Sequence, residues 1–102
     1  MTMHKIHVQN AARPGSVRAV DATKYEAMKR AFLAVLPASP PGLTVAEIRE
    51  RLASQLSQEL FPDGAKATWW AKTIQLDLEA KGVVRRVKTR PLRLHRVRTG
   101  GA

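Results

Sequence analysis

The spacing of apolar residues changes at Gly82, and this change restricts the possible folds more than any other feature of the chain. Before Gly82, apolar residues recur at helical intervals in three segments. They predict helices over about residues 23–36, from Thr44 onward, and over about residues 67–81. After Gly82, valines alternate with basic residues, which predicts two strands joined by a turn at residues 89–91. Three helices followed by a β-hairpin are therefore expected.

Local signals mark where the helices begin and end. Asp21 and Thr23 are both candidate N-caps of the first helix. Thr23 with Glu26, and Thr44 with Glu47, have the spacing of a capping box, in which side chains and backbone bond reciprocally at a helix start. Gly82 suits the left-handed residue that follows a helix. The apolar faces of the second and third helices predict a buried core that contains Ile48, Leu52, Trp70, Ile74 and Leu78.

The length of 102 residues predicts a single domain, because two independent cores need a longer chain. We expect residues 1–21 to form an extended N-terminal arm, residues 22–98 the folded domain and residues 99–102 a disordered tail. In the arm, Ile6 and Val8 alternate with polar neighbours and permit one short strand. The chain has no cysteine, which excludes disulfides, thiolate nucleophiles and cysteine-ligated zinc.

Positive charge is concentrated at the C-terminal end of the chain. The formal net charge is +10, and the last twenty residues contribute +7 of it because they contain no acid. Their basic residues are Arg85, Arg86, Lys88, Arg90, Arg93, Arg96 and Arg98. This density favours a polyanionic partner such as nucleic acid or an anionic membrane surface. The alternative is a solvated hairpin whose charges discourage edge-to-edge pairing.

The apolar stretches are too short to span a membrane. The longest, residues 31–37, is far shorter than the ~20 residues that a spanning helix needs. No apolar run lies near the N-terminus, so no secretory signal is expected and the protein is predicted to be cytoplasmic. No helix combines a basic face with a bulky apolar one, so a membrane partner is not expected.

The order of elements and two motifs resemble a winged helix-turn-helix domain. Residues 43–48 (LTVAEI) are similar to the start of its second helix, and residues 74–86 (IQLDLEAKGVVRR) to the junction of recognition helix and wing. The resemblance covers residues 22–98. It implies an α+β, mainly α fold, namely a three-helix winged helix-turn-helix with a C-terminal β-hairpin wing. One departure is the segment of residues 58–67, which exceeds the usual turn of about 3–4 residues.

The whole chain is also similar to an uncharacterised bacterial family of small domains. The motifs that carry this resemblance are residues 24–28 (KYEAM), 36–44 (LPASPPGLT), 61–64 (FPDG) and 70–82 (WAKTIQLDLEAKG). The resemblance supports the expected fold and implies no activity.

No pattern in the sequence indicates an enzyme. The histidines are His4, His7 and His95, and a metal site from all three requires the arm to pair with the hairpin, so unligated histidines are expected. The serines lack a nearby histidine–aspartate arrangement, and no glycine-rich loop precedes a helix as a phosphate cradle does. We therefore expect no catalytic residue, no metal ligand and no cofactor.

Two hypotheses of function remain. In the first, a DNA-binding protein, such as a transcriptional regulator, contacts duplex DNA with its wing and third helix. The residues expected there are Lys72, Thr73 and Gln75 on the helix, and Arg85, Arg86, Lys88, Arg90 and Arg93 on the wing. In the second, the domain binds protein rather than DNA, and Trp69, Leu76 and the N-terminal arm form a homodimer or another partner surface.

Overall fold

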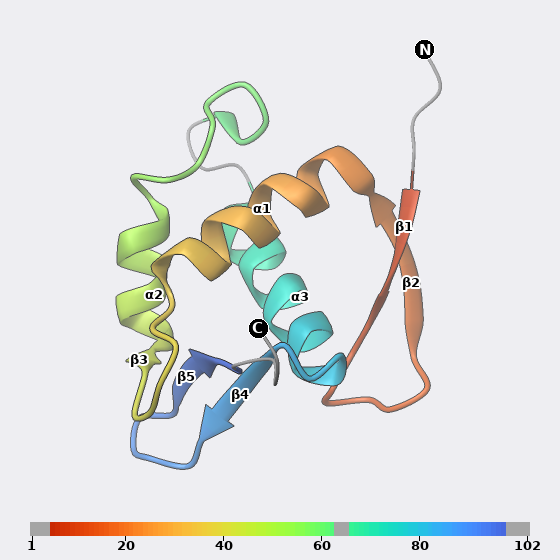
Figure 1. The fold of residues 1–102 in the computed structure, drawn as a ribbon. Helices are drawn as coiled ribbons and strands as arrows, with labels where there is room; N and C mark the ends of the chain where they lie inside the picture. Colours follow the sequence, from red (N-terminus) through yellow and green to blue (C-terminus); the bar gives the residue numbers. More distant parts are fainter. Residues whose placement is uncertain (1–4, 63–65, 98–102) are drawn as a thin grey trace.

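The computed structural model describes residues 5–62 and 66–97, which form three helices and five strands (Figure 1). In chain order these are β1 (Lys5–Gln9), β2 (Val17–Asp21), α1 (Ala22–Val35), β3 (Leu43–Thr44), α2 (Val45–Leu52), α3 (Ala67–Ala80), β4 (Val84–Val87) and β5 (Arg93–Arg96). Among these helices, none has the length and apolar character needed to cross a bilayer.

The strands form two antiparallel sheets. β1 and β2 make a separate hairpin in which Ile6 lies opposite Val20 and Val8 lies opposite Arg18. In the second sheet β5 lies between β3 and β4, so that Leu94 pairs with Leu43 on one side and Arg86 on the other. The β4–β5 hairpin expected after Gly82 is therefore extended by a third, very short strand.

The expected winged helix-turn-helix fold is contradicted by this arrangement. Two strands precede the first helix and the strands divide into two sheets, which does not fit a helix-dominated winged helix. The reason lies in residues 5–21, where Val8 and Val20 are buried while most of their neighbours are exposed. Strands with one buried face require both pairing and a covering element. This segment accordingly folds as a hairpin against the helices.

α3 lies at the centre of the molecule, with α2 on one side and the β1–β2 hairpin on the other (Figure 1). It packs against α1, β1 and β4. Because it is covered from several directions, Gln75, Leu76 and Asp77 are buried although they lie outside its apolar stripe. The core predicted from the sequence is confirmed, since all of its members are buried: Ile48, Leu52, Trp70, Ile74 and Leu78.

The helix starts agree in part with the sequence signals. The capping box of α2 is confirmed, because the Glu47 N–H donates to the Thr44 hydroxyl and the Thr44 N–H donates to the Glu47 carboxylate. Of the two candidate N-caps of α1, the structure uses Asp21, whose carboxylate accepts the N–H groups of Thr23 and Lys24, in place of a capping box at Thr23. Asp21 thus ends β2 and starts α1, which joins the N-terminal hairpin to the first helix without an intervening loop.

Two glycines with left-handed backbone differ in what surrounds them. Gly42, just before β3, has a φ of +85°, and a Cβ placed there would lie 2.1 Å from the carbonyl oxygen of Leu94 in β5. Gly15, in the β1–β2 turn, has a φ of +89° with nothing within 4 Å of the same position. The close approach of β3 to β5 therefore requires glycine at position 42.

We expect Gly42→Ala to destabilise the protein more than Gly15→Ala. Both changes place a side chain on left-handed backbone, which costs about 1–2 kcal/mol. At position 42 the methyl group must also displace the backbone of β5, which adds about 1–3 kcal/mol. Urea denaturation of both variants measures the difference, and equal losses would contradict the close packing of β3 on β5.

The core makes a second quantitative prediction. Ile74 and Leu52 are buried, so Ile74→Ala or Leu52→Ala leaves a cavity and should lower the free energy of unfolding by about 2–5 kcal/mol. Val17 is 58% exposed, and Val17→Ala serves as the control, with an expected change within about 0.5 kcal/mol. Losses at the two core positions no larger than that of the control would show that the helix faces are misassigned.

Candidate nucleic-acid interface

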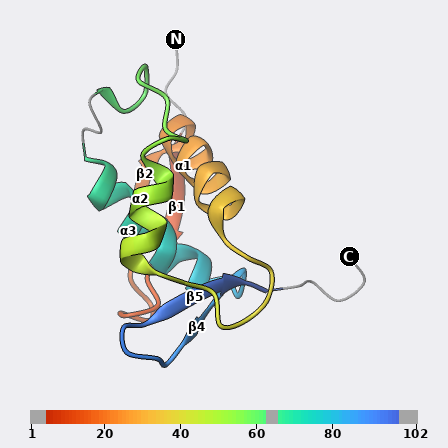
Figure 2. The same ribbon diagram turned by 90° about the vertical axis from the view of Figure 1, so that its left-hand side faces the viewer.

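Basic side chains from both ends of the chain gather at one end of the molecule. Figures 1 and 2 both show the turns of the β1–β2 and β4–β5 hairpins at its lower end. The first turn and β2 carry Arg13 and Arg18, and residues 83–97 carry only basic charges. Asp21, at the last position of β2, is the first acidic residue of the described chain. The fold therefore places two acid-free basic segments at the same end of the molecule, on opposite sides of it in Figure 1.

Several arginines of the β4–β5 hairpin are engaged within the protein. Arg86 donates through Nε and Nη2 to the two carboxylate oxygens of Glu79 on α3, at 2.7 and 3.0 Å. This bidentate bond to Glu79 raises the pKa of Arg86. Arg93 is half-buried and donates to the Gly42 carbonyl at 3.1 Å, and Arg96 donates to the Leu36 carbonyl at 3.0 Å. These arginines hold the second sheet against the rest of the protein.

Three other cations of this hairpin remain directed to solvent. Arg85, Lys88 and Arg90 are exposed, and the side chain of none of them makes a hydrogen bond or ion pair with the residues that the structure describes. Of the five wing residues expected to contact DNA, these three have no side-chain partner. Arg86 bonds to Glu79 but keeps 42% of its side chain exposed, and the half-buried Arg93 bonds to the Gly42 carbonyl. Arg98, counted in the basic segment, lies outside the described residues.

The acidic side chains close to these elements also have internal partners. Asp21 and Glu47 cap helices, and hydrogen bonds from Thr44 hold the pKa of Glu47 below its ordinary value. Glu79 accepts from both Arg86 and Gln75, while Asp77 is fully buried. The Glu47 side chain remains 45% exposed and lies 3.5 Å from Arg93 of β5. The residues Glu26, Glu50 and Glu59 are exposed on α1, on α2 and after α2.

α3 does not present the base-reading face that the sequence predicted. Lys72 is exposed and Thr73 is half-buried, but Gln75 is 2% exposed and its amide donates to Glu79 at 3.0 Å. The predicted trio is therefore not assembled on the surface. Leu76, expected in an apolar partner surface with Trp69, is buried, and its carbonyl accepts the N–H of Ala11. Trp69 remains 41% exposed.

A groove lies between the β1–β2 hairpin and α3, and the sequence analysis did not identify it. Its volume is about 330 Å³, and it is lined by Val8, Gln9, Asn10, Arg13, Ser16, Arg18, Trp69, Lys72, Thr73 and Leu76. Three of these side chains are cations and none is an acid. The guanidinium carbon of Arg18 lies 5.8 Å from the centre of the Trp69 ring, within the range of a cation–π contact. The missed residues, Arg13 and Arg18, lie in the segment expected to be an arm.

The buried carboxylate of Asp77 fixes the hairpin that forms one wall of this groove. It accepts the N–H of Gln9 in β1 at 2.8 Å and the hydroxyl of Tyr25 in α1, and the ammonium of Lys81 lies 3.0 Å away. The charge is thus paired and its oxygens are hydrogen-bonded, as a buried charge requires. Through these bonds α3 holds both β1 and α1.

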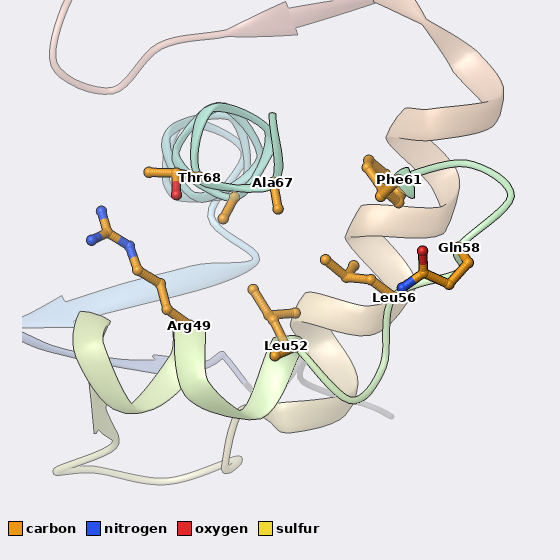
Figure 3. A pocket seen from close by; sticks show the side chains of 9 residues that line it. Arg49, Leu52, Leu56, Gln58, Phe61, Ala67 and Thr68 are labelled. Atoms are coloured by element: carbon orange, nitrogen blue, oxygen red, sulfur yellow. The ribbon is translucent and has the colours of Figure 1, made fainter. Parts of the chain in front are cut away.

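A second recess lies between α2 and the start of α3 (Figure 3). Figure 3 shows Arg49 at one end and Phe61 at the other, with Leu52 and Leu56 between them. Phe61 follows α2 and is buried against Trp70 with the rings edge-to-face. With one cation and an apolar floor, this recess lacks the clustered charge of the groove beside the hairpin.

The histidines are distributed over separate elements. His7 is exposed on β1, whereas His95 is buried on β5 in the other sheet, and His4 lies outside the described residues. Within residues 5–62 and 66–97, no group of three histidine, cysteine or acidic side chains lies together as metal ligands would.

The chain matches a known protein family. The profile of a family described as "Family of unknown function (DUF6958)" matches residues 5–94, which is most of the chain and runs from the start of β1 into β5. Neither the curated proteins nor the solved structures contain a significant match.

The Asp77 contact predicts a stability loss at alkaline pH. Burial, the hydrogen bond to Asp77 and the negative charges nearby raise the pKa of Tyr25 above its ordinary value of 10. Since this pKa is higher in the folded than in the unfolded state, the contribution is present below pH 10 and is lost as the pH rises further. We expect the unfolding free energy to fall above about pH 10, and Tyr25→Phe to remove this part of the dependence.

Tyr25 is the single tyrosine of the chain, so tyrosinate absorbance reports on it alone. The folded protein should resist ionisation until it unfolds. Lysines titrate in both the parent and Tyr25→Phe, so the difference between the two pH profiles isolates the phenol. Reversible ionisation of the folded protein near pH 10 would contradict the buried contact.

Proposed function

The chain belongs to the family of unknown function DUF6958, and we propose from its own surface that it binds nucleic acid through the phosphate backbone. The contacts come from the basic end, which we define as Arg13, Arg18, Lys72, Arg85, Lys88 and Arg90. This proposal keeps the nucleic-acid partner expected from the sequence and makes no use of a winged helix.

The observation that carries the proposal is the sorting of charges. The cations of the basic end have no carboxylate partner among the described residues, while Asp21, Glu47, Asp77 and Glu79 are hydrogen-bonded to other groups of the protein. A surface arranged in this way has a positive potential that attracts a polyanion. Nucleic acid presents regularly spaced phosphates, and their neutralisation by lysine and arginine releases counterions.

Contacts to phosphates position a protein, whereas contacts to base edges specify a sequence. Gln75 is buried and bonded to Glu79, which leaves Lys72 and the half-buried Thr73 as the polar groups of the predicted reading face. The proposed binding is therefore only weakly dependent on sequence.

The test compares two double charge reversals. Lys88→Glu with Arg90→Glu removes two cations from the basic end, and Arg30→Glu with Arg51→Glu makes the same change in net charge on exposed positions of α1 and α2. Binding to a fluorescent oligonucleotide is measured across a salt series. We expect the first variant to lose most of its affinity and its log–log salt slope to become shallower by about 1.4–1.8.

The control variant should keep its salt slope and lose affinity only modestly, through the reduced net charge. Thermal denaturation checks that both variants fold, as exposed positions should allow. Equal weakening by the two reversals would show that net charge alone causes binding. Failure of the parent protein to bind at 50 mM salt would remove the proposal.

A further inference from the structure

We infer that the groove between the β1–β2 hairpin and α3 receives an unpaired nucleotide, so that the preferred nucleic acid is single-stranded. The phosphate would contact Arg13, Arg18 and Lys72, and the base would pack against Trp69. This inference rests on the proposed function and names the substrate class of the same surface.

The groove has the chemistry of a phosphate site. Arg13, Arg18 and Lys72 converge on it from the turn, from β2 and from α3, and no carboxylate lines it. Guanidinium groups match the oxygens of a phosphate with paired N–H donors. Neutral donors are also present, because Ser16 and Thr73 line the groove with hydroxyl groups.

Arg18 already contacts the groove wall before any ligand binds. Its guanidinium carbon lies over the Trp69 ring, 5.8 Å from the ring centre, which is a cation–π contact. A side chain already restricted in this way loses less conformational entropy when it binds a phosphate. The cation–π contact thus links the charged and aromatic parts of the groove.

Trp69 supplies the surface for a base. Its ring meets Trp70 edge-on, with centroids 5.1 Å apart and an interplanar angle of 89°. Trp70 is buried and therefore fixes the inner side of Trp69, while 41% of Trp69 remains exposed. Unpaired bases stack on such aromatic rings and on the planes of arginine guanidinium groups.

The size of the groove favours a single strand over a duplex. A volume of about 330 Å³ is at the small end of ligand pockets, which range over roughly 300–1,000 Å³, and it suits one nucleotide. Within a duplex the faces of a base are stacked on its neighbours, so no internal base is free to reach Trp69. The accessible cations of the β4–β5 hairpin are then available to the backbone on either side of the bound nucleotide.

The experiment follows tryptophan emission and affinity with four probes: an oligothymidylate of about ten nucleotides, a duplex and an abasic oligomer with as many phosphates, and thymidine monophosphate. We expect the oligothymidylate to quench Trp69 and to bind more tightly than the duplex or the abasic oligomer. Trp69→Ala should weaken oligothymidylate binding by roughly 5- to 150-fold and abolish the quenching. It should leave binding of the abasic oligomer nearly unchanged.

Three further variants separate the contributions. Arg18→Ala should weaken binding of the oligothymidylate and of the abasic oligomer alike, while Trp69→Phe should retain part of the preference for bases. Val17→Ala, which alters an exposed apolar residue of the same hairpin outside the groove, should bind as the parent does. Quenching by thymidine monophosphate at high concentration would support the same site, because it carries both the base and the phosphate.

The outcomes distinguish this inference from the proposed function. If the oligothymidylate and duplex bind equally and Trp69→Ala changes neither, the groove inference fails while nucleic-acid binding stands. If no probe binds the parent protein, both fail. If Trp69→Ala instead abolishes self-association measured by analytical ultracentrifugation and leaves oligothymidylate affinity unchanged, Trp69 belongs to a protein interface and the inference is wrong.

Discussion

The buried carboxylate of Asp77 joins three parts of the chain that are far apart in sequence. It accepts the Gln9 N–H of β1 and the Tyr25 hydroxyl of α1, and Lys81 neutralises it one helical turn further along. Removing one partner of such a buried group leaves the others unsatisfied, which is costly. The position of the N-terminal hairpin on α3 therefore depends on Asp77, and so does the groove that the hairpin and α3 enclose.

One face of this hairpin contributes both to the core and to the candidate binding surface. Val8 and Val20 are buried, and Arg18, which pairs with Val8 and lies two residues before Val20, shares their face and reaches Trp69 at the groove. Residues that pair directly across two strands, or that lie two apart in one strand, point to the same side of the sheet, so the two valines and the arginine lie next to one another there. The cation–π contact of Arg18 with Trp69 is a second link between the hairpin and α3. It lies at the groove, whereas the hydrogen bond between Asp77 and the Gln9 N–H involves a buried carboxylate.

The sequence predicted the helices, the β4–β5 hairpin and the core residues well, because these follow from apolar spacing and capping residues. It failed where burial comes from several directions. The apolar stripe predicts that Gln75 and Leu76 face solvent, because it describes a helix covered on one side, whereas α3 is covered by α1, β1 and β4.

The alternation of Ile6 and Val8 predicts one strand in residues 1–21. The second strand has no such alternation, because its valines, Val17 and Val20, are three residues apart. The groove could not be predicted, because Arg13, Arg18 and Lys72 meet only through the tertiary packing.

The hydrogen bonds that arginines make within the protein explain why the number of basic residues in the sequence overstates the number available to bind a partner. Arg86, Arg93 and Arg96 bond to Glu79, to the Gly42 carbonyl and to the Leu36 carbonyl, so they fasten the second sheet to α3, to the residue before β3 and to the end of α1. The N–H groups used in these bonds are not free to contact phosphates, although Arg86 and Arg96 stay exposed. These bonds nevertheless fix the position of the β4–β5 turn. They therefore also fix where the exposed residues Lys88 and Arg90 lie. The basic segment thus contains two groups of residues. One group holds the β4–β5 hairpin in position through internal hydrogen bonds, and the side chains of the other group have no partner within the protein.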